Sequence, residues 1–147
     1  MSKIDLPLVL YDLIHEYLDF IDKLHHKTTC KYLKLIKIMD LYNIDNKYLK
    51  KLNDQILKSY IYVTQLNASF NPNITSLNHM TKLKKLDICG ECGVGDNGIS
   101  NLNLEELHAS YNPKITSLNH MTKLKKLDIW GDCGIGDNGI SNFYNIS

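Results

Sequence analysis

The sequence predicts an α+β protein in which an N-terminal helical module is followed by a short solenoid with one parallel strand per turn. Three observations support this fold class. The letters ITSLNHMTKLKKLDI occupy residues 74–88 and return, 41 residues later, at residues 115–129. Within each 41-residue block an apolar pattern recurs at about half that period, which is typical of stacked repeats. The first forty residues instead have the i, i+3, i+4 apolar spacing of helices.

Composition limits the classes of function that fit the chain. Its 147 residues are 44% hydrophobic, with a net charge of +1, and every basic residue is lysine. No cluster of positive charge indicates a nucleic-acid or membrane-surface partner. No signal peptide precedes the first apolar residues, and no stretch approaches the ~20 apolar residues of a membrane span. We therefore expect an intracellular protein, cytoplasmic or nuclear, with reduced cysteines and no cofactor.

Residues 1–42 are predicted to form three helices. The first has one apolar face, and Pro7 suits its first turn because the missing N–H would be unpaired there anyway. That face carries Leu6, Leu10, Leu13, Ile14, Tyr17 and Leu18. Asp22 is a candidate cap for the second helix, and Thr28 or Thr29 for the third.

Residues 43–62 are predicted to link the module to the repeats through one more amphipathic helix, over residues 45–60. Leu49, Leu52, Ile56 and Leu57 share a face of that helix. Asp45 or Asn46 can cap it. Because the first turn of a solenoid must have its inner edge covered, we expect this helix to cover it.

Residues 63–147 contain four turns with the pattern L-x-x-L-x-L. The turns begin at Val63, Leu83, Leu104 and Leu124, and each pattern predicts one strand of a parallel ladder with strands about 4.8 Å apart. The chain here resembles leucine-rich repeats. Asn71 and Asn112, three residues past the strands of alternate turns, are predicted to bond backbone groups of the turn. The loops CGVGDNGI and CGIGDNGI are expected to need unusual backbone angles, which glycine adopts at low cost.

Stacking the turns in register brings surface side chains into columns on the predicted concave face. One column reads Gln65, Lys85, Glu106, Lys126, so that opposite charges alternate. The candidate target-binding residues are Lys85, Asp87, Glu106, His108, Tyr111, Lys126, Asp128 and Trp130. Two interpretations stay open: a partner-binding surface anchored by aromatic side chains, or a solvated face with self-complementary charges.

The N-terminal residues resemble an F-box. The matching residues are Leu6-Pro7, Ile14, Leu18-Asp19, Asp22, Leu24 and Cys30-Lys31-Tyr32, without a gap. The resemblance, to F-box/leucine-rich-repeat proteins of large DNA viruses of amoebae and protists, implies a substrate receptor of a cullin–RING ubiquitin ligase, in the host cell if viral. It implies that Leu6, Pro7, Leu10, Ile14 and Leu18 contact a Skp-type adaptor protein, and that the repeats hold an unknown protein target.

The remaining chemistry does not indicate an enzyme or a metal site. Cys89-x-x-Cys92 invites a zinc interpretation, but the second copy has Trp130 in place of the first cysteine. A tetrahedral site normally needs four ligands. We expect no catalytic residues, and the alternative to the ligase receptor is a plain protein-interaction scaffold. The uncapped C-terminal edge of the last turn also leaves open pairing with another chain.

Overall fold

The computed structural model describes residues 40–43, 49–58 and 60–143. All of them lie in the second of the two units into which the chain divides, Lys37–Ser147. The predicted three-helix module falls almost wholly outside the described residues, as do Leu6, Pro7, Leu10, Ile14 and Leu18. These assignments, and the predicted domain boundaries, therefore stay predictions.

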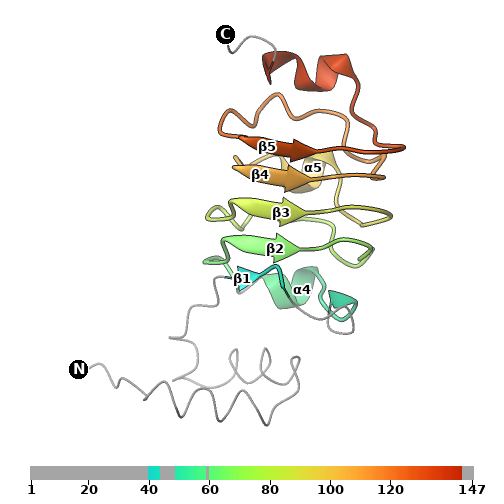
Figure 1. Ribbon diagram of the computed structural model, residues 1–147. Helices are drawn as coiled ribbons and strands as arrows, with labels where there is room; N and C mark the ends of the chain where they lie inside the picture. Colours follow the sequence, from blue (N-terminus) through green and yellow to red (C-terminus); the bar gives the residue numbers. More distant parts are fainter. Residues whose placement is uncertain (1–39, 44–48, 59, 144–147) are drawn as a thin grey trace, which may run out of the picture. The chain divides into compact units, whose positions relative to one another are not determined.

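A parallel five-stranded sheet forms the framework, and each strand pairs with the next along the chain (Figure 1). The strands are β1 (Asp40–Leu41), β2 (Gln65–Asn67), β3 (Lys85–Asp87), β4 (Glu106–His108) and β5 (Lys126–Asp128). Because sequential neighbours run parallel, the chain completes one full coil between consecutive strands. This arrangement confirms the predicted parallel sheet with one strand per turn.

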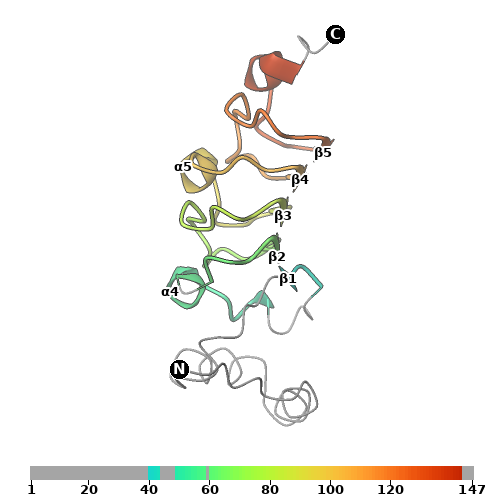
Figure 2. The same cartoon turned by 90° about the vertical axis from the view of Figure 1, so that its left-hand side faces the viewer.

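The core lies directly behind the sheet. The middle residue of each inner strand points inward, and the side chains of Leu66, Leu86 and Leu107 are fully buried and in register. The return segments lie behind them and carry α4 (Asp54–Leu57), α5 (Asp96–Ile99) and a 3₁₀ helix, η2 (Asp137–Phe143). Figure 2 shows the strands along one side of the coil and α4 and α5 along the other. Among the described residues, no helix is long and apolar enough to cross a membrane.

The strand β1 was not predicted. It pairs Asp40 with Gln65 and Leu41 with Leu66, which adds a turn before the four that the sequence pattern indicates. Leu41 is almost completely buried, as its equivalents in the later strands are. The sequence pattern missed this turn for two reasons. Its strand lacks the letters that the later strands share, and the stretch from β1 to β2 is longer than the stretch between later neighbouring strands.

The helix predicted over residues 45–60 is interrupted within the described residues. Asn53 accepts a hydrogen bond at its Oδ1 from the Ile56 amide (3.0 Å) and starts α4. The carbonyls of Leu49 and Leu52 accept hydrogen bonds from Asn71 Nδ2 instead of continuing a helix, at 2.5 and 3.0 Å. Apolar residues spaced three and four apart therefore pack in a loop here, although the same spacing is also typical of a helix.

The two buried asparagines bond backbone groups of their own turn, as predicted, and also hold successive turns together, which was not predicted. Asn112 Nδ2 donates to the carbonyls of Ile88 (3.0 Å) and Val94 (3.2 Å) in the preceding turn, and Asn112 Oδ1 accepts from the Lys114 amide. Asn71 does the same for the turn before it. Both side chains are fully buried, and their hydrogen bonds supply partners for carbonyls that water does not reach.

The glycine loops are built differently from the prediction. Positive φ occurs at Gly90 and Gly131, just after the strands, and not within the loops CGVGDNGI and CGIGDNGI. Within those loops glycine serves close approach, because a Cβ on Gly93 would collide with the backbone carbonyls of Pro72 and Ile74. This part of the loop needs glycine because a side chain would not fit there, and not because the backbone angles are unusual.

Candidate functional site

The outward side chains of the strands form a continuous polar surface, here called the strand face. It consists of the first and third residues of β2 to β5: Gln65, Asn67, Lys85, Asp87, Glu106, His108, Lys126 and Asp128. The pairing register aligns Lys85 with Glu106 and Glu106 with Lys126, as the sequence predicts. The alternation of inward and outward residues along each strand produces this surface.

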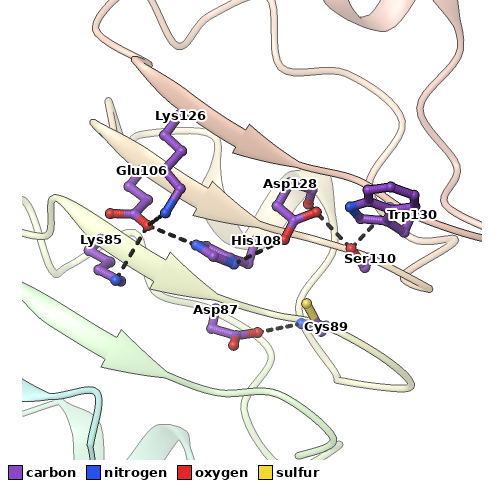
Figure 3. Close-up of polar contacts among 9 residues, drawn as sticks. All are labelled: Lys85, Asp87, Cys89, Glu106, His108, Ser110, Lys126, Asp128 and Trp130. Carbon is purple, nitrogen blue, oxygen red and sulfur yellow. Dashed lines mark hydrogen bonds and ion pairs between the residues drawn. The ribbon is translucent and has the colours of Figure 1, made fainter.

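Glu106 is the centre of a charge network on the strand face (Figure 3). Its Oε1 accepts hydrogen bonds from Lys126 Nζ at 2.7 Å and from His108 Nε2 at 2.8 Å, and Lys85 Nζ lies 3.3 Å away. The hydrogen bonds from His108 and then Lys126 lower the pKa of Glu106 from 4.5 to about 2. The carboxylate is therefore ionised at neutral pH and attracts side chains from three strands.

A second charged column runs beside the first, and the sequence reasoning missed it. Glu105 lies 3.1 Å from Lys84 Nζ and 2.8 Å from Lys125 Nζ. Hydrogen bonds from Lys125 and Lys84 lower the pKa of Glu105 to about 2. The doublets Lys-Lys, Glu-Glu and Lys-Lys at equivalent positions of three turns were the available signal.

His108 connects the charge network to the carboxyl ends of the strands. Its Nδ1 lies 3.5 Å from Asp128 Oδ2, so the ring stands between two carboxylates. Nε2 carries a hydrogen, because its partner is the Glu106 carboxylate. Asp87, although aligned with His108, accepts a hydrogen bond from the Cys89 amide at 3.0 Å. Within the part of the chain that the structure describes, Asp128 Oδ1 is buried without a hydrogen-bond partner.

Three exposed aromatic side chains lie just past the strands. Trp130 is 70% exposed and Tyr111 is 60% exposed, and Phe70, which was not among the predicted site residues, is 67% exposed. Phe70 and Tyr111 have positive φ, and their rings lie where a Cβ on Gly90 or Gly131 would be. These two rings therefore cover glycines in the next turn, which is a structural role. Trp130 has no such constraint.

Trp130 occupies a position that holds a small residue in the other turns. Ser69, Cys89 and Ser110 stand there in the turns of β2, β3 and β4. The Trp130 amide donates to Ser110 Oγ at 3.0 Å, which holds its backbone in the regular path while its indole remains in solvent (Figure 3). A large apolar side chain is thus exposed at the place where the two copies of the repeat differ.

Tyr42 extends the strand face at its β1 end. The Lys85 ammonium lies 4.1 Å from the centre of the Tyr42 ring, at cation–π distance. Burial, together with Asp87 and Glu106, raises the pKa of the Tyr42 hydroxyl. The sequence reasoning missed this contact because it assigned residue 42 to the helical module.

Cys89, Cys92 and the histidines His79 and His120 have structural roles. Burial and the neighbouring Asp87 raise the pKa of Cys89 to about 12, so its thiol stays protonated at neutral pH and is a poor nucleophile. Burial also raises the pKa of Cys92, whose thiol donates to the Ile88 carbonyl. His79 and His120 hydrogen-bond the carbonyls of Leu57 and Ile99 in preceding turns.

The described residues contain no group of three or more His, Cys, Asp or Glu side chains placed to hold a metal ion. What their geometry offers is a regular polar face with exposed aromatic side chains at one end. Compared with known proteins, the chain matches no family model, no curated protein and no solved structure.

Proposed function

We propose that the chain is a non-catalytic receptor in which leucine-rich repeats bind a protein target through the strand face. In this proposal residues 1–42 are an F-box that binds the Skp-type adaptor of a cullin–RING ubiquitin ligase. The ungapped F-box register supports the second part, and the regular coil that follows it supports the first. A module for the ligase and a surface for a target are the two parts that such a receptor requires.

The observation that carries the target-binding role is the exposure of Trp130. A tryptophan that is 70% exposed leaves a large apolar surface in water, which is unfavourable unless a partner covers it. Tryptophan is also the residue most enriched among side chains that dominate protein–protein binding energy. Its small equivalents in the other turns show that the coil itself does not need it.

The charge on the strand face indicates the chemistry of the target. The amino ends of β3 and β5 carry Lys84, Lys85, Lys125 and Lys126, which outnumber the two glutamates between them. The carboxyl ends carry Asp87 and Asp128, next to the aromatic side chains. A target segment lying along the strands would thus place basic residues near Trp130 and acidic residues near the lysines, because complementary charge sets orientation.

Adaptor binding is tested with the purified full chain and a purified Skp-type adaptor. We expect the wild type to bind and the double variant Leu10→Asp/Ile14→Asp to lose binding at least tenfold, since buried charge at an interface is costly. The matched control is Trp130→Cys, which changes the repeats and leaves residues 1–42 intact. Absence of binding by the wild type would remove the ligase role.

Target binding is tested through the intrinsic fluorescence of Trp130, because the chain has no other tryptophan. Proteins recovered with the chain are purified and titrated against it. A target that covers the indole shifts its emission to shorter wavelength. Trp130→Cys, which restores the residue of the first copy, should weaken that target's binding at least tenfold. Equal binding by the variant would exclude the strand face near Trp130.

A plain interaction scaffold is the second candidate. It rests on the strand face and the exposed Trp130, both of which belong to the unit Lys37–Ser147 and require no ligase module. If residues 1–36 only cap the repeats, deleting them unfolds residues 37–147, and the full chain binds no Skp-type adaptor. If they are an F-box, the truncated protein keeps its cooperative unfolding and its target. The deletion stops before β1, so that the first strand stays in place.

A further inference from the structure

Lysines and carboxylates are separated along the strand direction. Between residues 63 and 143, every lysine except Lys114 lies within or just before β3 and β5. Glu105 and Glu106 stand among these lysines, which outnumber them. The carboxyl ends of the same two strands and the residues that follow them carry Asp87, Glu91, Asp128 and Asp132. The carboxyl end of the strand face is therefore acidic, and a positively charged group on a partner complements it.

Two exposed aromatic side chains lie at this acidic end. The backbone pairing with the turn of β4 continues beyond β5, because the Tyr111 amide donates to the Trp130 carbonyl at 2.8 Å. The chain is thus extended as far as Trp130, and the alternation of side chains places Asp128 and Trp130 on the same face. Figure 3 shows Asp128 between His108 and Trp130. The Tyr111 ring lies against Gly131, the residue directly after Trp130. An aromatic surface therefore adjoins a carboxylate.

Asp128 lacks the local hydrogen bond that its equivalents in β2 and β3 make. Asn67 and Asp87 each accept a hydrogen bond from the amide two residues later, at 3.0 Å. In the turn of β5 that amide belongs to Trp130 and donates to Ser110 Oγ instead. Within the described ranges, Asp128 Oδ1 has no hydrogen-bond partner. The Asp128 side chain is 38% exposed, so a donor on a partner can reach the carboxylate once it turns. Such a donor would stabilise an acceptor that is otherwise unpaired.

We infer that Asp128, Trp130 and Tyr111 bind an arginine side chain of the protein target. A guanidinium group stacks on aromatic rings and donates parallel hydrogen bonds to a carboxylate, so it matches both parts of this site. A lysine ammonium is a point charge and lacks the flat surface that lies against an indole. The inference rests on the proposed target binding through the strand face, and it does not depend on the F-box.

The lysines at the opposite end of the strand face set a second requirement for the target. The side chains of Lys84 and Lys125 are 64% and 74% exposed. Lys125 precedes Trp130 by about five residues, which is about 17 Å of extended chain. A target segment that lies along the strands therefore has an acidic residue about five positions from its arginine.

The probe is a synthetic peptide with arginine and glutamate at that spacing, titrated against the purified full chain. The emission of Trp130, the single tryptophan, is the readout. We expect a saturable shift in the millimolar range. The same peptide with citrulline, which has nearly the same shape as arginine and no charge, should bind at least fivefold more weakly. A lysine peptide should also bind more weakly than the arginine peptide. No response to the arginine peptide, or an equal response to either substituted peptide, overturns the inference.

A pair of variants locates the site. Asp128→Asn keeps the shape of the side chain and removes its charge, and it should weaken binding of the arginine peptide about fivefold or more. The matched control is Asp87→Asn, the same substitution in the identical stretch of the first copy, which should bind as the wild type does. Urea denaturation checks that both variants fold. Equal binding by the two variants contradicts the inference.

Failure of the inference is distinguishable from failure of the proposed function. A chain that binds the Skp-type adaptor and its recovered target, but responds equally to the arginine and citrulline peptides, refutes only the arginine site. A chain that binds the arginine peptide and not the adaptor loses only the ligase role.

Discussion

The two copies of the fifteen-letter stretch, residues 74–88 and 115–129, have the same local structure and different surroundings. In both, a leucine amide in the return segment donates to a glycine carbonyl in the following turn, Leu77 to Gly98 and Leu118 to Gly139, at 2.8 Å. Yet Leu86 and Ile88 are fully buried, whereas Leu127 and Ile129 are partly exposed. Identical sequences therefore form the same local backbone structure. The presence of a following turn decides how completely their apolar side chains are buried, and so how much they stabilise the fold.

The largest expected effect separates the leucines that face the next turn. Leu86→Ala should lower the free energy of unfolding by about 3 kcal/mol, because it removes a fully buried side chain and leaves a cavity. Leu127→Ala should cost about 1 kcal/mol, since part of that side chain is already in water and no full cavity forms. Urea denaturation at a concentration where the chain is monomeric measures both.

Wild-type protein and the conservative variants Leu86→Met and Leu127→Met are the controls for this pair, because they keep most of the apolar volume. Equal costs for the two alanine variants would contradict the difference in burial. They would mean that the end at β5 is covered in the monomer as completely as the middle of the coil.

The next effect should be the same in both copies. Asn71→Ala and Asn112→Ala each remove hydrogen bonds to carbonyls of the preceding turn, which exists in both cases, and leave buried carbonyls unpaired. Each should cost about 2 kcal/mol in urea denaturation. The asparagines bond the preceding turn, whereas the leucines are covered by the following turn. The asparagine and leucine variants therefore test contacts on opposite sides of each copy. A much smaller cost at Asn112 than at Asn71 would show that the second copy is generally looser.

The smallest effect concerns Glu106, which joins Lys85 of one copy to Lys126 of the other. Its pKa of about 2 in the fold lies below the ordinary 4.5, so the folded state favours the ionised form. This contribution is present above pH 4.5 and is lost as the pH falls toward 2. Glu106→Gln should reduce the loss of stability over that interval. The difference should stay below about 1 kcal/mol, because solvent screens these half-exposed groups.

Thermal unfolding followed by circular dichroism between pH 2 and 7 measures this difference between variant and wild type. Glu105, whose pKa is also about 2, titrates in the same interval, so Glu106→Gln leaves part of the dependence in place. The control is Glu91→Gln, an exposed carboxylate on a loop. An unchanged pH dependence in Glu106→Gln would show that its ion pairs do not stabilise the fold.

Much of the repeat was predictable because it depends on short-range patterns. The period of the leucines gives the strand positions β2 to β5, and their alignment gives the pairs Lys85–Glu106 and Glu106–Lys126. The hydrogen bonds of Asn71 and Asn112 within their own turns were predictable from their place after the strand. The exposure of Trp130 and Tyr111 fits the columns that the register defines. These properties depend on residues that contact equivalent neighbours in every turn.

Other features depended on contacts between segments of different sequence, which a repeated pattern does not predict. β1 has only two residues and becomes a strand by pairing with β2. The helix expected before β2 is interrupted where Asn71, about twenty residues later, binds the carbonyls of Leu49 and Leu52. The Tyr42–Lys85 contact and the aromatic cover on Gly90 likewise join separate turns.

By itself the sequence determined that this chain coils with a leucine-rich period and which side chains each turn directs outward. That follows because strand alternation and the spacing of apolar residues are local properties. Only the tertiary structure decided that β1 adds a strand before β2, and that Leu127 and Ile129 are partly exposed although Leu86 and Ile88, in an identical stretch, are buried. The burial of a side chain depends on the segments that pack against it, and the sequence of a single repeat does not specify those segments.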